Sequence, residues 1–392
     1  MRFPIASICL REVTFVTEVR LMIPGPVEAE DSVLSVIGEQ TLPHYGPLWM
    51  PLFEETVSLL KQLFMTQGDV IVMPGPGSAA LDAAVASLVP QGASACVLDN
   101  GFFGMRATQI IEANGIHPWV VKAPWGRHVD PADVRTSLRD WIPQAKRAGQ
   151  PIRALVMIHH ETSTGVLNPL RDIAAVAHEF DLPLIVDAVA SLGGVPVAVD
   201  EWGIDVCVSV PNKCLGVPPG VALMAVSPRA WELAKSNPSR HGWYLDLRTW
   251  RWYIDNWGDW HPYPTTLPTN NIVALHQGLK DIFAGGLEAH FAAFQRAAAQ
   301  AREGMAALGF TLFPEPQYAA PPISAFNARP DVDTGDLLRY LLHEHGLMVS
   351  GGLAELKGKI FRVGHMGRAR EPQVVSALLE ATRIYLTEHA PA

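Results

Sequence analysis

Short runs of apolar residues alternate with longer stretches of helical periodicity from about residue 70 onward. The apolar runs predict strands at residues 69–73, 93–98, 119–122, 153–159, 183–187, 204–209 and 221–226. Helical patterns between them cover residues 78–88 and 102–114. Strands that are apolar on both faces and separated by helices are typical of a mostly parallel sheet sandwiched by helices, which predicts an α/β fold. Such sheets bind ligands beyond the carboxyl ends of their strands.

The pattern changes after about residue 260. We expect helices at residues 271–284, 287–308, 334–345 and 372–388, and short strands at residues 309–313 and 360–363. This pattern is typical of a smaller α+β domain. We therefore predict an N-terminal extension (1–20), a large domain (21–280) and a small C-terminal domain (281–392). The tryptophan-rich segment 243–260 is either a packed surface crossing or an oligomer contact.

The composition is that of an ordinary globular protein, since 48% of the 392 residues are hydrophobic and 18% are charged. A net charge of −9 without basic runs argues against nucleic-acid binding. No apolar run reaches the roughly 18 to 20 residues that a membrane helix needs. We expect a reducing, cytoplasmic environment because no CxxC spacing occurs among the cysteines Cys9, Cys96, Cys207 and Cys214.

The first residues have a faint similarity to a signal peptide. Arg2 is followed by the apolar residues 3–10, but Arg11 and Glu12 come next and no clear cleavage site is present. A non-essential extension is the better interpretation.

Lys213 follows the apolar run at residues 204–209, and a rigid turn at residues 217–220 comes soon after it. A lone lysine in a loop is most often a solvated surface charge. Here apolar and small residues enclose the lysine, and burial would depress its pKa so that the uncharged amine could act as a nucleophile. The motif alone leaves both interpretations open.

Two further motifs lie at predicted strand ends. Asp187 ends the run at residues 183–187, where it either caps the next segment or pairs with a buried cationic ring nitrogen of a cofactor. The segment 74–79 connects a strand to a helix and contains Gly77, Ser78 and Ala79. Its backbone N–H groups could approach a phosphate, although most such segments are simple turns.

Polar residues also follow the strand predicted at residues 153–159. The Thr162 hydroxyl could bind a cofactor or cap the next helix. The adjacent His159 and His160 suggest a metal site, but consecutive strand residues point to opposite faces, so we predict no metal. Arg362, beside glycines in the predicted strand 360–363, could clamp a substrate carboxylate or form a structural salt bridge.

Together these motifs resemble the class V aminotransferases, which are pyridoxal-phosphate (PLP) enzymes of fold type I. The alanine–glyoxylate and serine–glyoxylate (serine–pyruvate) group is most similar, and pyridoxamine–pyruvate aminotransferases also look similar. The resemblance runs from about Leu21 to the C-terminus and opens with the Pro-Gly-Pro sequence within residues 21–26. The interval of 26 residues from Asp187 to Lys213 matches that of the family.

The resemblance implies that PLP is bound by Gly77, Ser78, Ala79, Phe103, Thr162, Asp187, Val189, Asn212, Lys213, Tyr263 and Thr266. Lys213 would form the Schiff base and move the proton, and Asp187 would pair with the pyridine nitrogen. Phe103 and Val189 would pack against the two faces of the ring.

The same resemblance places Ser78 and Ala79 in the phosphate loop, Thr162 at the ring oxygen and Asn212 beside the lysine. It also implies that Tyr263 and Thr266 reach the phosphate of the neighbouring subunit, which predicts a homodimer with shared active sites.

The implied activity is transamination of a small L-amino acid, of the alanine or serine type, with glyoxylate or pyruvate as acceptor. Arg362 would bind the carboxylate common to both substrates. Free pyridoxamine is a less favoured substrate, because Pro76 and Leu353 stand where pyridoxamine-specific relatives carry a glutamate and an arginine.

Three other functions stay open. A PLP lyase would share the cofactor, and a desulfurase would need a mobile cysteine, for which Cys214 is the candidate. A catalytically silent regulator is disfavoured because Lys213 and Asp187 are both present.

Overall fold

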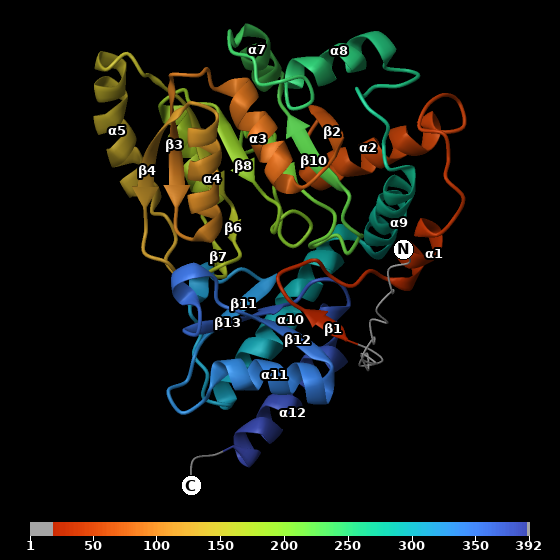
Figure 1. Cartoon of the computed structure of the whole chain (residues 1–392), viewed down its shortest axis with the longest axis vertical. Coiled ribbons are helices and arrows are strands. Elements are labelled where there is room, and N and C mark those ends of the chain that lie inside the picture. Colours follow the sequence, from red (N-terminus) through yellow and green to blue (C-terminus); the bar gives the residue numbers. More distant parts are fainter. Residues whose placement is uncertain (1–18, 390–392) are drawn as a thin grey trace, which may run out of the picture.

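A large central sheet dominates residues 19–389, the part of the chain that this computed structural model describes (Figure 1). Its seven strands lie in the order β2 (Asp69–Pro74), β10 (Val221–Val226), β9 (Val206–Ser209), β8 (Leu184–Asp187), β5 (Ile152–Ile158), β3 (Ser94–Asp99) and β4 (His117–Lys122). In this sheet β10 runs in the direction opposite to the other six strands, which are parallel to one another. The predicted α/β fold with a mostly parallel sheet is confirmed.

Helices cover both faces of this sheet. In the order of the chain they are α1 (Asp31–Ile37), α2 (Met50–Phe64), α3 (Gly77–Leu88), α4 (Phe102–Ala113), α5 (Pro131–Arg147), α6 (Leu170–Glu179), α7 (Pro228–Ser236), α8 (Leu247–Trp257) and α9 (Thr269–Gly285). In Figure 1, α3 and α4 lie side by side across the sheet, where they contact each other and the strands behind them. None of the helices within residues 19–389 is long and apolar enough to cross a membrane.

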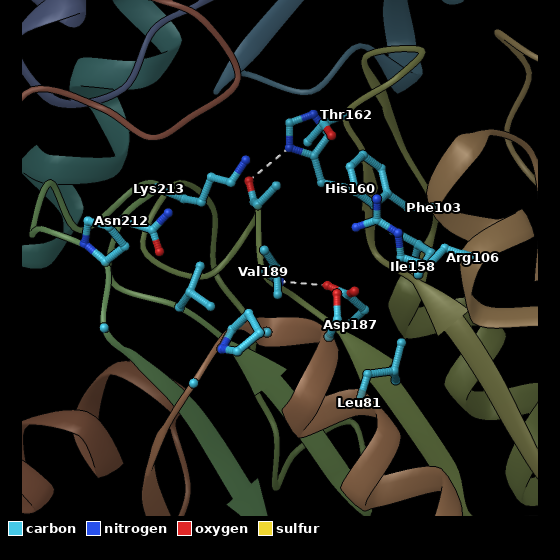
Figure 2. A pocket seen from close by; sticks show the side chains of 18 residues that line it. Leu81, Phe103, Arg106, Ile158, His160, Thr162, Asp187, Val189, Asn212 and Lys213 are labelled. Carbon is cyan, nitrogen blue, oxygen red and sulfur yellow. Dashed lines mark hydrogen bonds between the residues drawn. The ribbon is translucent and has the colours of Figure 1, made fainter. Parts of the chain in front are cut away.

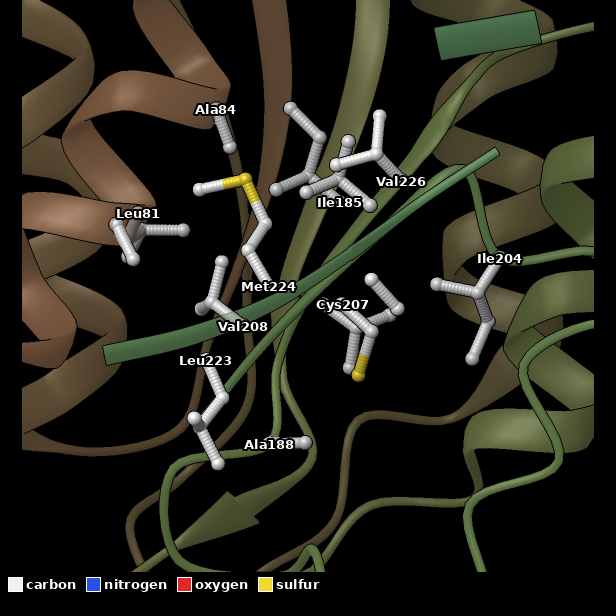
Figure 3. Close-up of a cluster of buried hydrophobic side chains, with 14 of the residues drawn as sticks. Leu81, Ala84, Ile185, Ala188, Ile204, Cys207, Val208, Leu223, Met224 and Val226 are labelled. Atoms are coloured by element: carbon white, nitrogen blue, oxygen red, sulfur yellow. The ribbon is translucent and has the colours of Figure 1, made fainter. Parts of the chain in front are cut away.

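Buried side chains on both faces explain the continuous apolar runs. Met224 of β10 is paired with Val208 of β9, and Figure 3 shows both on the side where Leu81 of α3 packs. Cys207, the next residue along β9, points to the opposite side, where Ile204 lies. All five side chains are buried, so each face of the sheet contributes to the core.

A second, smaller sheet lies at the other end of the molecule (Figure 1). Its order is β1 (Arg20–Met22), β12 (Leu347–Gly351), β13 (Ile360–Gly364) and β11 (Ile323–Asn327). The helices of this part are α10 (Leu287–Ala307), α11 (Thr334–His345) and α12 (Pro372–Glu388), with short 3₁₀ turns at Pro316–Tyr318, Ala354–Leu356 and Gly367–Arg370. Phe310, Phe326 and Phe361 pack together in its core.

Strand β1 joins the small sheet although it is distant in sequence from the other strands. It pairs in parallel with β12, with Leu21 opposite Met348. The chain therefore begins its described part in the small sheet, crosses to the large sheet and returns through α9 and α10. The proposed domain limits at residues 20/21 and 280/281 stay a prediction, and the predicted extension lies almost entirely outside the described residues.

The strand predicted at residues 309–313 is wrong. This segment makes only an isolated bridge, between Leu312 and Phe326. Pro314 follows at once and cannot donate a backbone hydrogen bond, so the pairing ends there. The tryptophan-rich segment 243–260 contains α8. In this helix Trp250 is buried, while Trp252 and Trp257 are exposed.

Candidate functional site

A cavity of about 560 Å³ lies at the carboxyl ends of β5, β8 and β9 (Figure 2). This is the edge of the sheet at which the sequence predicts a ligand site. Those of the predicted residues that line it are Gly77, Ser78, Phe103, Thr162, Asp187, Val189, Asn212 and Lys213. They come from five separate segments of the chain. The sheet brings the segments together because parallel strands end at the same edge.

Four predicted residues do not line this cavity. They are Ala79, Arg362, Tyr263 and Thr266. Ala79 lies in the first turn of α3, where its N–H donates to the Pro76 carbonyl at 2.9 Å.

Lys213 projects into the cavity from the loop after β9. Its Nζ donates to the Pro24 carbonyl of the Pro-Gly-Pro segment. Gly25 has a φ of +106°, and a Cβ there would lie 2.6 Å from the lysine Cδ, so only glycine fits against this side chain. Desolvation lowers the pKa of Lys213 to about 8, with Arg362 and Arg106 also disfavouring the charge. An uncharged amine is therefore accessible near neutral pH.

Asp187 lies at the end of β8 and faces the same cavity. Its Oδ1 accepts a hydrogen bond from the Val189 N–H at 2.9 Å, the only one recorded for this side chain within residues 19–389. Burial raises the pKa of Asp187 to about 6, although Lys213 and Arg106 act in the opposite direction. A partly buried carboxylate with so few donors favours a positively charged partner in the cavity.

The N-terminus of α3 faces the cavity next to Val189. Gly77 is the first residue of this helix, and a Cβ added there would lie only 2.6 Å from Val189 Cγ2. The glycine therefore permits close packing between the helix start and the loop after β8. The N–H groups and dipole of a helix start favour a phosphate.

Glu161 was missed by the sequence analysis, although it fixes the wall of the site. It lies in the short hairpin of β6 (His160–Glu161) and β7 (Val166–Leu167). Its Oε2 accepts hydrogen bonds from the N–H groups of Phe103 at 2.9 Å and Gly104 at 3.1 Å. Its Oε1 accepts from the Ser163 N–H at 3.0 Å and hydroxyl at 2.5 Å.

These bonds cap the first turn of α4, because they satisfy N–H groups that have no partner within the helix. Phe103 is thereby held at the cavity wall. Burial raises the pKa of Glu161 to about 7, although its hydrogen bonds act against that shift.

Arg106 was also missed, and it lines the cavity from α4. Its guanidinium carbon lies 5.1 Å from the Phe102 ring centroid and 4.9 Å from that of Phe103. No ion pair of Arg106 is recorded within the described residues. The signal in the sequence was its position three residues after Phe103, which places both side chains on one face of a helix.

Arg362 of β13 lies at the junction of the two sheets and is only 5% exposed. Its Nε and Nη2 donate to the Gly351 carbonyl at 3.0 and 2.9 Å, and its Nη1 donates to the Thr162 carbonyl at 3.1 Å. Burial lowers its pKa to about 10, and the nearby Glu161 opposes this effect. The guanidinium is joined to the backbone of the cavity wall, and its substrate role stays a prediction.

Tyr263 and Thr266 lie together with His44, outside the cavity. The Tyr263 hydroxyl donates to the His44 carbonyl, and the Thr266 hydroxyl lies 3.4 Å from His44 Nε2. Neither side chain lines the cavity of its own chain, and their predicted contact with a phosphate stays a prediction.

Three residues considered for alternative functions, His159, His160 and Cys214, also have defined positions. His160 lines the cavity and His159 does not, and no group of three side chains suited to a metal ion occurs within residues 19–389. The Cys214 thiol is buried and donates to the Ala190 carbonyl at 3.4 Å. Burial raises its pKa to about 12, which disfavours the mobile thiolate of a desulfurase.

Comparison with known proteins identifies the family. Residues 110–369 match the profile described as "Aminotransferase class-V", so the chain belongs to the class V aminotransferases. The predicted family, enzyme class and PLP cofactor are thereby confirmed.

Individual relatives match over nearly the whole chain. Alanine–glyoxylate aminotransferase from Callithrix jacchus is 32% identical over 95% of this chain and 88% of its own length. Pyridoxamine–pyruvate transaminase from Mesorhizobium japonicum is 30% identical over 91% and 88%. The crystal structure of alanine–glyoxylate aminotransferase from Nostoc sp. has a TM-score of 0.88 and 32% identity, covering 96% of this chain and 97% of that one.

The residues that line the cavity fit PLP. Three features match the cofactor in chemical type. A lysine with a lowered pKa suits its aldehyde, a partly buried carboxylate with one hydrogen bond suits its ring nitrogen, and a helix start packed through Gly77 suits its phosphate.

Proposed function

We propose that this enzyme transfers the amino group of a small L-amino acid, of the alanine or serine type, to glyoxylate or pyruvate. The observation that carries the proposal is that Lys213, Asp187 and the start of α3 face one cavity. Relatives named for glyoxylate and pyruvate transamination support the choice of acceptor.

Bound PLP would supply an electron sink next to the substrate Cα. Lys213 Nζ would bind the cofactor and, once released from it, accept and return the proton at the substrate Cα. Its lowered pKa keeps a fraction of the amine uncharged at neutral pH. The Asp187 carboxylate would hold the proton on the ring nitrogen. The protonated nitrogen is positively charged, and pairing with it would stabilise a carboxylate that has no ion pair within the described residues.

The remaining cavity residues would position the cofactor. Phe103 and Val189 lie on walls where they can pack against the ring, and α4 is fixed by Glu161. The first turn of α3, including Ser78 and Ala79, would hold the phosphate. Thr162 and Asn212 would donate hydrogen bonds near the ring oxygen and Lys213.

Arg362 would bind the substrate carboxylate. Its three hydrogen bonds go to neutral backbone carbonyls, which a charged carboxylate could replace with stronger, bidentate bonds. Pro76 lines the cavity and has no polar side chain for a pyridoxamine hydroxyl, which supports an amino acid as the amino donor.

We further propose a cytoplasmic homodimer with shared active sites. Tyr263 and Thr266 lie outside the cavity of their own chain, as expected if they serve the other subunit. The exposed aromatic residues Tyr45, Trp243, Trp252, Trp257 and Trp260 are suited to an interface. A reducing environment is supported by Cys96, Cys207 and Cys214, which are free and buried.

A single-turnover panel tests the function. The holoenzyme is mixed with individual L-amino acids, and loss of the cofactor's visible absorbance is followed, and then its return with glyoxylate or pyruvate. We expect alanine or serine to react fastest. A holoenzyme that converts pyridoxamine and no amino acid would contradict the proposal.

A further inference from the structure

His160 reaches the cavity from β6, between the loop that carries Thr162 and the side chain of Lys213 (Figure 2). The residue is 2% exposed. Nδ1 lies 2.8 Å from the Ala190 carbonyl oxygen. A carbonyl oxygen only accepts, so Nδ1 carries the hydrogen and Nε2 is left with a lone pair. Burial lowers the pKa of His160 to about 4, which keeps the ring neutral.

Nε2 has no hydrogen-bond partner among the described residues, although it is buried. The cationic groups near the ring are directed elsewhere. Lys213 Nζ donates to the Pro24 carbonyl, and Arg302 donates to the Ser324 hydroxyl and to the Ala320 carbonyl. A buried acceptor without a donor is costly, and because the side chain of His160 lines the cavity, a ligand bound there could supply the donor.

The cofactor has no donor left for this position in the proposed arrangement. Asp187 would hold the proton on the ring nitrogen, Thr162 would bind the ring oxygen, and a phosphate mainly accepts hydrogen bonds. A substrate whose Cα–H bond faces Lys213 would place its other Cα substituents in the surrounding cavity, which His160 also lines (Figure 2). A hydroxyl on the substrate Cβ is the smallest group that could donate there.

We propose that His160 is a specificity-determining residue whose Nε2 accepts a hydrogen bond from the side-chain hydroxyl of the amino donor, so that the enzyme favours β-hydroxy amino acids over alanine. This inference rests on the proposed transamination of small amino acids and selects between the two types left open there. A site built to bind a substrate hydroxyl rejects the analogue without it, because the acceptor then stays unpaired.

A pair of substitutions separates the two ring nitrogens. His160→Asn has an amide N–H that can replace Nδ1 in the bond to Ala190, but it has no group at the position of Nε2. His160→Gln extends an amide oxygen toward the Nε2 position. We expect wild-type kcat/KM to be at least about tenfold higher for L-serine than for L-alanine. His160→Asn should lose most of this preference by slowing serine, and His160→Gln should retain part of it.

Binding without turnover gives a second measurement. α-Methyl-L-serine and 2-aminoisobutyrate have no proton on Cα, so they can bind the holoenzyme but not complete transamination. Calorimetry should give wild type about tenfold tighter binding of α-methyl-L-serine, and His160→Asn should equalise the two. His159→Asn is the matched control, since this neighbouring buried histidine does not line the cavity, and it should keep the wild-type preference.

The outcomes are distinct. An unchanged serine-to-alanine ratio in folded His160→Asn would overturn the role of His160, while transamination itself would stand. If that variant does not fold, equal wild-type binding of the two analogues would overturn the role as well. A wild-type holoenzyme that transaminates no amino acid would instead overturn the proposed function.

Discussion

The two sheets that meet at the cavity differ in how their functional side chains are held. On the large sheet, Lys213 and Asp187 lie at strand ends and face the cavity directly. On the small sheet, Arg362 is buried and all three of its recorded hydrogen bonds go to backbone carbonyls. The side chains proposed to bind the cofactor are thus brought to the cavity by the fold, whereas Arg362 would have to exchange hydrogen-bond partners in its proposed role of binding the substrate carboxylate. Substitutions of Lys213 or Asp187 should therefore impair the chemistry of the cofactor, whereas substitutions of Arg362 should impair the reaction with substrate and leave cofactor binding intact.

Lys213→Ala should have the largest effect. Only an uncharged amine at this position can bind the cofactor covalently, so we expect the visible absorbance of the holoenzyme and its turnover to be lost while the fold is kept. Lys122→Ala is the control, because Lys122 ends β4 at the same edge of the sheet but is exposed and does not line the cavity. More than a trace of transamination by Lys213→Ala would show that the assignment is wrong.

Asp187→Ala should reduce turnover by about a thousandfold, on the order of 4 kcal/mol, because the ring nitrogen loses the partner that keeps it protonated. Asp205→Asn provides the comparison. Asp205 is buried near the amino ends of β8 and β9 and accepts a bond from the Leu184 N–H at 3.0 Å, so it should change thermal stability more than turnover. An Asp187→Ala rate within about tenfold of wild type, ~1.4 kcal/mol, would mean that Asp187 is only a cap.

Arg362→Lys tests the substrate side. The charge is kept but the planar fork is lost, so we expect both half-reactions to slow by about a hundredfold, with cofactor affinity little changed. Single-turnover kinetics of each half-reaction, with the dissociation constant of PLP measured in parallel, would show this separation. Wild-type amino-acid deamination by this variant would remove the carboxylate role from Arg362.

The contrast between the sheets also explains how much the sequence could predict. Lys213, Asp187 and Gly77 follow apolar strands, and strand ends in a parallel sheet converge, so their common cavity was predictable. Glu161 acts on the N–H of Phe103, a contact across 58 residues that periodicity does not report.

Strand β1 was not predicted, since its partner β12 lies more than 300 residues away in sequence and local periodicity does not report such a pairing. The strand predicted at residues 309–313 had a suitable local pattern, but Pro314 limits its pairing to one bridge.

Thr266→Ala should weaken PLP retention by about tenfold, because the proposed phosphate contact would be lost. Mixing it with Lys213→Ala tests whether the cofactor side extends across two chains. If Thr266 serves the other subunit, a mixed dimer has one site with both lesions and one with neither, so activity partly returns. No recovery after confirmed subunit exchange would place the contact within one chain.

Glu161→Gln should have the smallest effect, and it probes the link between the two sides. Glu161 caps the helix that carries Phe103, while the carbonyl of the next residue, Thr162, holds Arg362. Glutamine keeps one acceptor for the N–H groups of α4, but its NH₂ group cannot accept from Ser163. We expect turnover to fall by about five- to tenfold, on the order of 1 kcal/mol, with a broader visible spectrum as Phe103 loses its fixed position.

The pH dependence of stability gives an independent measurement of Glu161. Burial raises its pKa from 4.5 to about 7, so the folded protein binds this proton more tightly than the unfolded chain. The contribution of Glu161 to the free energy of unfolding is therefore fully present below pH 4.5 and is lost as the pH rises through 7. In the cofactor-free protein, Glu161→Gln should flatten this part of the profile, whereas Glu179→Gln, at an exposed carboxylate, should not. Parallel profiles for wild type and Glu161→Gln would show that Glu161 is ionised in the folded state throughout this range.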